Sequence, residues 1–249
     1  MEHPFTFFQA YLPNVTEDNL HLVTAGFVVL LLALGVAALY PRLRNAKRNV
    51  LPEGKVNLKS FFEIFMEMLA DLCEEIIGHG GKKYLPFVGT IFFFIFVSNL
   101  VGLIPGFLPP TENWATGAAI ATISFLAFNY FGIREHGVGY FKHFLAPISP
   151  GPIKGVIRFV LIMVPILLLN LLFAPVELLS LVFRPITLSI RLFANIFADH
   201  QVLSIFSSLV PYLVPLPFMV LGIFVSFMQA FIFTLLNVVY ISGAVAHEH

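Results

Sequence analysis

The C-terminal part of the chain contains one very long stretch without charge. Residues 201–246 are 46 residues with no Asp, Glu, Lys, Arg or His. As one straight helix this stretch would measure on the order of 70 Å, more than twice the hydrocarbon thickness of a bilayer. It must therefore be interrupted or strongly tilted. Pro211, Pro215 and Pro217 predict the interruption, and we expect the last helix at 218–246.

The composition favours a membrane environment for the whole chain. Of its 249 residues, 58% are hydrophobic and 11% are charged, whereas soluble domains carry roughly 25% charged residues. The mean hydropathy is +0.90. The net charge is zero and no basic cluster is interleaved with aromatic residues, so we expect no nucleic-acid partner. The single Cys73 excludes an internal disulfide.

The apolar runs predict an all-α, polytopic membrane protein with one membrane domain over 1–249. A helix needs about 20 mostly apolar residues to cross a bilayer. Five membrane-crossing helices are expected, at 22–40, 84–105, 114–133, 155–209 and 218–246. The first of them is expected to be retained, because Glu2, Glu17 and Asp18 stand where a signal peptide would carry bases.

Residues 57–77 predict one further helix, which is amphipathic and lies on the membrane surface. Its apolar residues recur at helical spacing on one face, and the other face carries Glu63, Glu67, Asp71, Glu74 and Glu75. Membrane-surface anchors usually carry bases on the polar face. The acidic face therefore favours a protein partner over anionic lipid. A solvated face without a partner is the alternative.

The distribution of bases predicts the orientation of the chain. Twelve of the 14 Lys and Arg residues lie in loops that a single topology places on one side of the membrane. By the positive-inside rule that side is the cytoplasm. The N-terminus is then outside and the C-terminus cytoplasmic. The opposite loop at 106–113 carries Glu112 and no base, which agrees with this orientation.

The two remaining bases, Arg184 and Arg191, lie inside the predicted helix at 155–209. An arginine at the bilayer centre costs at least about 2.5 kcal/mol, so it normally faces protein or water. A spacing of three or four residues places six polar side chains on one helix face: Glu177, Ser180, Arg184, Thr187, Arg191 and Asn195. His200 falls on the opposite face, which suggests two aqueous compartments separated by the helix. A purely structural ion pair between Arg191 and Glu177 is the alternative.

The last helix carries a shorter polar face. Gln229 shares that face with Ser226, Tyr240 and Gly222. The pattern is compatible with a polar site that this face shares with the polar face around Arg191. It is also compatible with a single interhelical hydrogen bond from Gln229.

The sequence contains no motif of a soluble enzyme, so we expect a non-catalytic protein without a cofactor. The run from Gly78 to Lys83 lacks the spacing of a phosphate-binding loop. His247, Glu248 and His249 provide no further ligand nearby, so a solvated C-terminus is expected and no metal site.

Two motifs carry a resemblance to a known family. They are Ser-Ile-Arg-Leu-Phe-Ala-Asn at 189–195 and Gln-Ala-Phe-Ile-Phe at 229–233, followed by Tyr240. Together with Ser98-Asn99-Leu100 and Gly102-Leu103-Ile104-Pro105, the chain closely resembles subunit a of the rotary F-type ATP synthases, and a bacterial one. The resemblance extends over the whole chain.

The resemblance implies a fold, partners and a location. The last two helices are expected to form a long, tilted hairpin against the ring of c subunits. The peripheral-stalk b subunits and membrane lipid are the other expected partners. The expected location is the bacterial inner membrane.

The resemblance also implies roles for individual residues. Arg191 corresponds to the essential arginine of the family, and Gln229 to its neighbour on the facing helix. Where many relatives carry a carboxylate nine residues after the arginine, this chain has His200, preceded by Asp199. Some relatives also carry histidine there, and these typically have a carboxylate on the last helix, seven residues before the glutamine. In this chain that position is Gly222, and Asp199 is the candidate substitute.

The implied function is proton translocation coupled to ATP synthesis. The subunit is expected to provide two aqueous half-channels and a fixed guanidinium opposite the carboxylates of the c-ring. The expected proton-translocation residues are Arg191, Glu177, Asn195, His200, Asp199, Gln229, Ser180, Arg184 and Tyr240. The alternative is a self-contained secondary transporter or channel in which Arg191 and Glu177 bind an anionic substrate. Such folds often show repeated halves, and no repeat is visible here.

Overall fold

The computed structural model describes residues 8, 17–44, 58–78, 80–104, 106–137, 175–176, 179–180, 183–199, 201–203, 205–206 and 215–245. Within these ranges the regular structure is helical throughout. The elements are α2 (Glu17–Arg44), α3 (Leu58–Ile77), η2 (Gly81–Tyr84), α4 (Leu85–Gly102), η3 (Pro110–Glu112), α5 (Trp114–His136) and α8 (Pro215–Val245). Residues 183–199 form a further helix, which we call the Arg191 helix. The protein is therefore an all-α polytopic membrane protein, as the sequence predicts.

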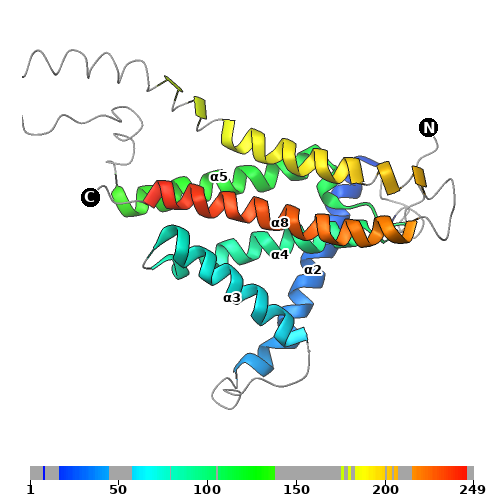
Figure 1. Ribbon diagram of the computed structural model, residues 1–249, viewed down its shortest axis with the longest axis horizontal. Helices are drawn as coiled ribbons and strands as arrows, with labels where there is room; N and C mark the ends of the chain where they lie inside the picture. The colour runs from blue at the N-terminus through cyan, green and yellow to red at the C-terminus, as the bar shows by residue number, and fades with distance from the viewer. Residues whose placement is uncertain are drawn as a thin grey trace, which may run out of the picture.

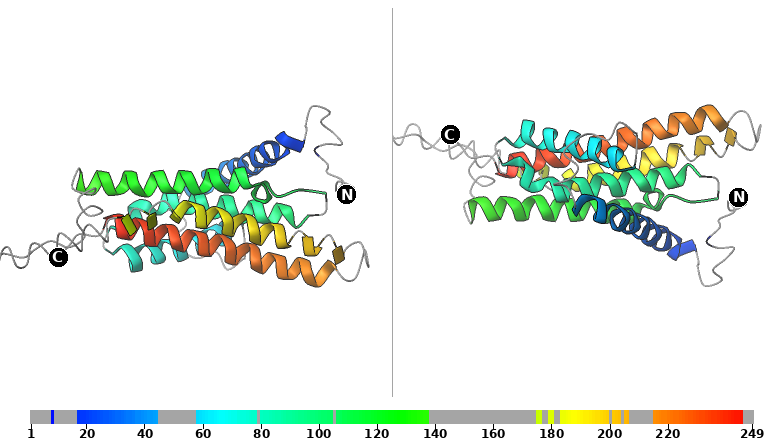
Figure 2. Two further views of the ribbon diagram at one scale, coloured as in Figure 1. Left: turned by 90° about the horizontal axis from the view of Figure 1, so that it is seen from above. Right: turned by 90° about the horizontal axis from the view of Figure 1, so that it is seen from below.

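The described helices form an elongated bundle (Figure 1). α4, α5, α8 and the Arg191 helix run side by side along its long axis, with α5 antiparallel to α4 and α8 antiparallel to the Arg191 helix. α2 is steeply inclined to this axis and diverges from the bundle in both views of Figure 2. α3 packs along one side, against α4 and α8.

Four described helices are long and apolar enough to cross a membrane. They lie at Asn19–Tyr40, Gly81–Gly102, Trp114–His136 and Leu216–Val245. The fifth crossing that the sequence predicts falls at 155–209. Most of that range before residue 183 lies outside the described residues, so a count of five remains a prediction.

The ends of α5 follow from local chemistry. The Asn113 Oδ1 atom accepts a 2.8 Å hydrogen bond from the Ala115 backbone N–H and caps the first turn. At the other end, Gly137 has a φ of 58°, a conformation that glycine adopts without a Cβ penalty. The helix therefore ends at the residue before this glycine.

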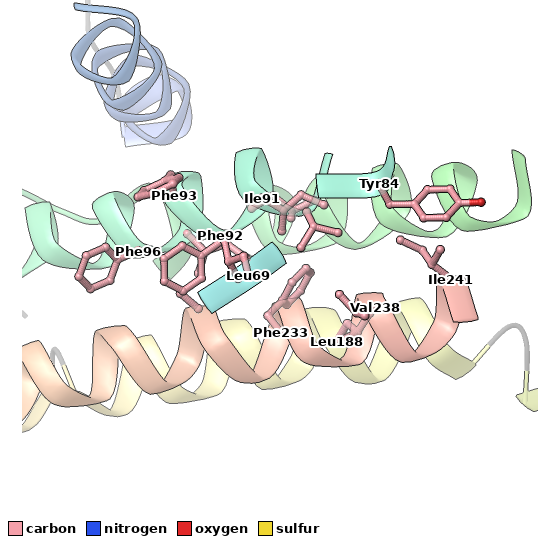
Figure 3. Packing of buried hydrophobic residues seen from close by; sticks show 14 of the residues in the cluster. Leu69, Tyr84, Ile91, Phe92, Phe93, Phe96, Leu188, Phe233, Val238 and Ile241 are labelled. Atoms are coloured by element: carbon pink, nitrogen blue, oxygen red, sulfur yellow. The ribbon is translucent and has the colours of Figure 1, made fainter. Parts of the chain in front are cut away.

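The core between the helices combines aromatic and aliphatic side chains (Figure 3). Phe92 of α4 and Phe233 of α8 are both fully buried, and Leu188 of the Arg191 helix is 1% exposed. α3 contributes Leu69 and Phe65, whose ring lies 5.5 Å from Phe92 between centroids. The apolar face of α3 thus packs on the bundle, whereas its five acidic side chains are exposed.

Polar contacts join the helices at the end of the bundle where α5 ends. Lys82 pairs with Glu74 of α3 at 2.8 Å, and Lys83 pairs with Glu135 of α5. The Ser242 hydroxyl of α8 donates a 2.9 Å hydrogen bond to the Ile76 carbonyl near the end of α3. Because these contacts link η2 to α3 and α5, and α8 directly to α3, they fix the relative position of the helices at this end.

Candidate functional site

The Arg191 helix and α8 are joined by two polar side-chain contacts. The Asn195 Nδ2 atom donates a 2.6 Å hydrogen bond to Gln229 Oε1. Further along the pair, Arg184 Cζ lies 5.0 Å from the centroid of the Tyr240 ring. From Arg184 to Asn195 is 11 residues (195 − 184), and from Gln229 to Tyr240 is also 11 (240 − 229). The two contacts are therefore two rungs of one antiparallel register, about three helical turns apart.

Arg191 lies between these two rungs. It is four residues before Asn195 and seven after Arg184, so the three side chains share one helix face. Arg191 is half-buried. Within the described part of the chain, no carboxylate forms an ion pair with its guanidinium. The ion pair with Glu177 that the sequence leaves open involves a residue outside the described ranges.

The Arg191 helix has a buried side and an exposed apolar side. Leu188, Ser189, Leu192 and Ile196 are buried against the bundle. On the other side, large apolar side chains remain exposed: Phe183 (55%), Ile186 (40%), Ile190 (48%) and Phe197 (44%). α8 exposes Val220, Leu221, Ile223 and Phe224. An apolar face of this kind is stable only against lipid or against another apolar protein.

α5 packs against the Arg191 helix. A Cβ atom on Gly117 would lie 3.4 Å from the Ser189 carbonyl oxygen and 3.5 Å from its hydroxyl oxygen. The Trp114 and Phe193 rings meet with centroids 6.2 Å apart. The small residue permits the two helices to approach closely, as in many membrane helix pairs.

Several buried polar atoms near the two helices have no hydrogen-bond partner among the described residues. Gln229 is 2% exposed, and its Nε2 atom is one of them. Ser189 Oγ, Thr234 Oγ1, Ser98 Oγ and Asn99 Nδ2 are others. Asn99 does use its Oδ1 atom, which accepts a 2.9 Å hydrogen bond from the Thr111 hydroxyl. Buried atoms of this kind are normally paired with protein or with ordered water.

The structure brings together four of the nine predicted site residues in the two rungs: Arg184, Asn195, Gln229 and Tyr240. Arg191 lies between them, and half-buried Asp199 lies at the last described position of the same helix. Ser180 is exposed. Glu177 and His200 lie outside the described residues.

The contact between Gly222 and Leu103 was not predicted from the sequence. A Cβ atom on Gly222 would lie 2.4 Å from Leu103 Cδ2, so Leu103 occupies the space beside this glycine. Ser98 and Asn99 were also not among the predicted site residues. The only indication in the sequence is that these two polar residues lie near the end of an otherwise apolar run. A single sequence does not distinguish a functional site there from helix packing. Among the described residues, no group of three His, Cys, Asp or Glu side chains could hold a metal ion.

The fold and the paired helices define a polytopic helical membrane protein with an arginine held at the edge of an apolar face. The family model described as the ATP synthase A chain matches residues 22–242. The "ATP synthase subunit a" of Bdellovibrio bacteriovorus is 40% identical over 240 residues, which are 95% of this chain and 96% of the relative. The "ATP synthase subunit a 1" of Syntrophotalea carbinolica is 38% identical, and the "ATP synthase subunit a" of Geotalea uraniireducens 37%, each over the full length of both chains.

The chain therefore belongs to the ATP synthase A chain family. As a member, it is a multi-pass bacterial membrane protein of ATP synthesis and proton transport, and it is not itself catalytic.

Proposed function

We propose that this subunit moves protons between two aqueous half-channels and the carboxylates of a c-ring, with Arg191 as the essential charge between them. One observation carries the proposal. Arg191 lies between two interhelical contacts, beside an apolar face and without an acidic partner among the described residues. An ionisable side chain inside a membrane is costly, and it normally faces protein or a water-filled cavity and marks an ion pathway.

The exposed apolar sides of the Arg191 helix and α8 are the proposed surface for the c-ring. Packing against a rotor subunit would remove these apolar side chains from water. It would also avoid fixed polar contacts, and such contacts would hinder rotation. Asn195 and Arg191 lie along the edge of this surface. A ring carboxylate that passes along it meets the guanidinium.

The chemistry of the arginine supports its role. A ring carboxylate must be neutral to pass through lipid, because burying its anion costs several kcal/mol. Opposite a fixed positive charge the ionised form is favoured, so the carboxylate releases its proton. A guanidinium keeps its charge under all physiological conditions, and so it blocks direct proton flow between the two half-channels.

The buried polar atoms support a route for water to the Arg191 helix. Gln229 Nε2 and Ser189 Oγ are buried and unpaired within the described part of the structure. We assign Glu177, Ser180, Asp199 and His200 to the two half-channels, together with Gln229 and Asn195. This assignment rests on the helix face that each residue occupies in the sequence.

We further propose the orientation and the stator contact. The N-terminus is outside and the C-terminus cytoplasmic, in the bacterial inner membrane, because the bases predict this side as cytoplasmic. The exposed acidic side of α3 contacts the peripheral-stalk b subunits. Reversing two of its charges, with Glu67→Lys and Asp71→Lys, should reduce the b subunits retained after native purification. The neutral pair Glu67→Gln and Asp71→Asn is the matched control, and equal retention in both would exclude this contact.

The experiment for the central proposal uses the whole ATP synthase in membrane vesicles. Arg191→Gln and Arg191→Lys should abolish ATP-driven proton pumping and proton-driven synthesis while the complex assembles. Lysine should fail because its ammonium is a compact point charge that loses its proton more readily than a guanidinium. Thr90→Ala is the control, since Thr90 is exposed and bonds only the Pro86 carbonyl of its own helix. Near-normal synthesis in assembled Arg191→Gln complexes would exclude the mechanism.

A further inference from the structure

The contact between Arg184 and Tyr240 pairs a cation with an aromatic ring. The guanidinium carbon lies 5.0 Å from the ring centroid, within the range in which a cation over a ring face is attracted by the π electrons. Phe128 of α5 packs against the same tyrosine, with centroids 5.7 Å apart. Within the described residues, the Tyr240 hydroxyl makes no hydrogen bond. The ring, which contacts both Arg184 and Phe128, is therefore the part of Tyr240 that the described structure uses.

A ring differs from a carboxylate in what it does to the charge. A carboxylate would neutralise Arg184, whereas an aromatic face stabilises the guanidinium and leaves its net charge at +1. Among the described residues at this end of the bundle, Glu135 of α5 pairs with Lys83 and Glu74 of α3 pairs with Lys82, and neither pairs with Arg184. Arg191, two turns away on the same helix, adds a second positive charge. The face therefore carries two cations about 10 Å apart.

We propose that Tyr240 is a positioning residue whose ring face holds Arg184 as a second fixed cation beside the path of the ring carboxylate. The inference rests on the function proposed above, which it deepens by assigning roles to the Arg184–Tyr240 rung. Since this rung lies five residues before the end of α8, it is on the cytoplasmic side of Arg191 in the proposed orientation. Its charge favours the ionised ring carboxylate at that side, and so assists proton release to the cytoplasm.

The Arg184 guanidinium requires a contact that fixes its position, because the arginine side chain is long and flexible. A free arginine near a membrane surface extends its guanidinium to the interface, which moves the charge away from the apolar face. Loss of the ring should therefore have the same consequence as loss of the charge. Loss of the hydroxyl alone should have none, because phenylalanine offers a ring face to the cation as well.

The direction of the effect follows from the protonation equilibrium. Without the cation, the pKa of the ring carboxylate at the cytoplasmic side rises, because its ionised form loses a favourable charge. ATP-driven pumping takes up protons from that side and declines when the pH exceeds this pKa. The pH at which ATP-driven pumping declines should therefore be higher in variants that lose the Arg184 charge or no longer hold it beside the ring carboxylate.

The test measures ATP-driven acidification of inverted membrane vesicles, whose bath contacts the cytoplasmic side, as a function of bath pH. Complexes carrying Tyr240→Leu and Arg184→Gln should both show the decline at higher pH, by a few tenths of a pH unit or more. Tyr240→Phe should match the parent. The double variant should shift no further than the larger single shift, because both changes remove one interaction. Tyr130→Leu is the control for the loss of a tyrosine, since Tyr130 is exposed and lies on α5, whereas Tyr240 lies on α8.

Two results would overturn the inference. If Tyr240→Phe shifts the profile as much as Tyr240→Leu, the hydroxyl is the functional group. If the shifts of Tyr240→Leu and Arg184→Gln add in the double variant, or are absent, the ring does not act through Arg184. Failure of the proposed function is a separate result, because it requires an assembled Arg191→Gln complex that still synthesises ATP.

Discussion

The side-chain amide of Asn195 donates a 2.6 Å hydrogen bond to the buried side chain of Gln229 and fixes the distance between the Arg191 helix and α8. Asn195 lies one helical turn from Arg191, toward the end of the bundle where α5 begins. The Arg184–Tyr240 contact has the corresponding position toward the other end. The two contacts define where the Arg191 side chain lies relative to α8.

The first prediction concerns this hydrogen bond. Asn195→Ala leaves Gln229 Oε1 buried without its partner, so it should destabilise the complex by about 1–2 kcal/mol. The double variant Asn195→Ala, Gln229→Leu removes both polar groups and should lose less stability than the sum of the single variants. The measurement is the rate of heat inactivation of assembled complexes for the parent, the two single variants and the double variant. Additive losses would show that the two amides do not interact. Thr122→Ala is the control, because Thr122 is exposed and donates its hydroxyl to the Ala118 carbonyl of its own helix.

The polar face of the Arg191 helix could be predicted from the sequence, because a spacing of three or four residues determines which side chains share a helix face. The structure accordingly brings Arg184 and Asn195 to the same neighbour, α8. The long apolar runs likewise predicted helices at 84–105 and 114–133, and the structure has helices at Gly81–Gly102 and Trp114–His136.

The pairing across the helices could not be predicted in the same way. Periodicity places Gln229 and Tyr240 on one face of α8, but it does not give the register against another helix. That register depends on how side chains such as Leu192, Phe233 and Leu188 fill the space between the helices, and each of these is buried. Leu103 beside Gly222 is a further case, since it comes from the end of a different helix.

The second prediction concerns the turn that joins α3 to α4. A Cβ atom on Gly81 would lie 2.2 Å from the Cys73 carbonyl oxygen, a backbone atom that cannot rotate away. Gly81→Ala should therefore force α3 and η2 apart and destabilise the complex by about 1–3 kcal/mol. The measurements are the yield and the heat stability of the assembled complex. Gly35→Ala is the matched control, because nothing lies within 4 Å of its added Cβ atom and alanine favours a helix. Equal behaviour of the two variants would contradict the close contact.

The third prediction concerns the thiol of Cys73. Burial against the bundle raises the pKa of Cys73 to about 11, because desolvation penalises the thiolate. Since alkylating reagents attack the thiolate, labelling at about pH 8 should be on the order of a hundred-fold slower than for an ordinary cysteine. Its rate should still be rising above about pH 9.5, where an ordinary thiol is mostly ionised.

The matched control for Cys73 is a cysteine at exposed Glu75, introduced as Glu75→Cys together with Cys73→Ala. Both cysteines then lie on α3, two residues apart, and differ in burial. The same reagent at the same pH gives the two rates directly. If Cys73 reacts as fast as the introduced cysteine, the buried position of this side of α3 is wrong.

The last prediction concerns His200, which follows half-buried Asp199 and lies outside the described residues. On a continuous helix it falls on the side opposite Arg191. An imidazole in contact with water titrates near pH 6.5, so it can exchange protons between solvent and a ring carboxylate. His200→Ala should slow passive proton conduction through the membrane sector severalfold and flatten its dependence between about pH 5.5 and 8.5, with assembly unchanged. Identical conduction in His200→Ala and the parent over that range would exclude the relay. Arg191 would be unaffected by that result, because its role depends on a charge that does not titrate.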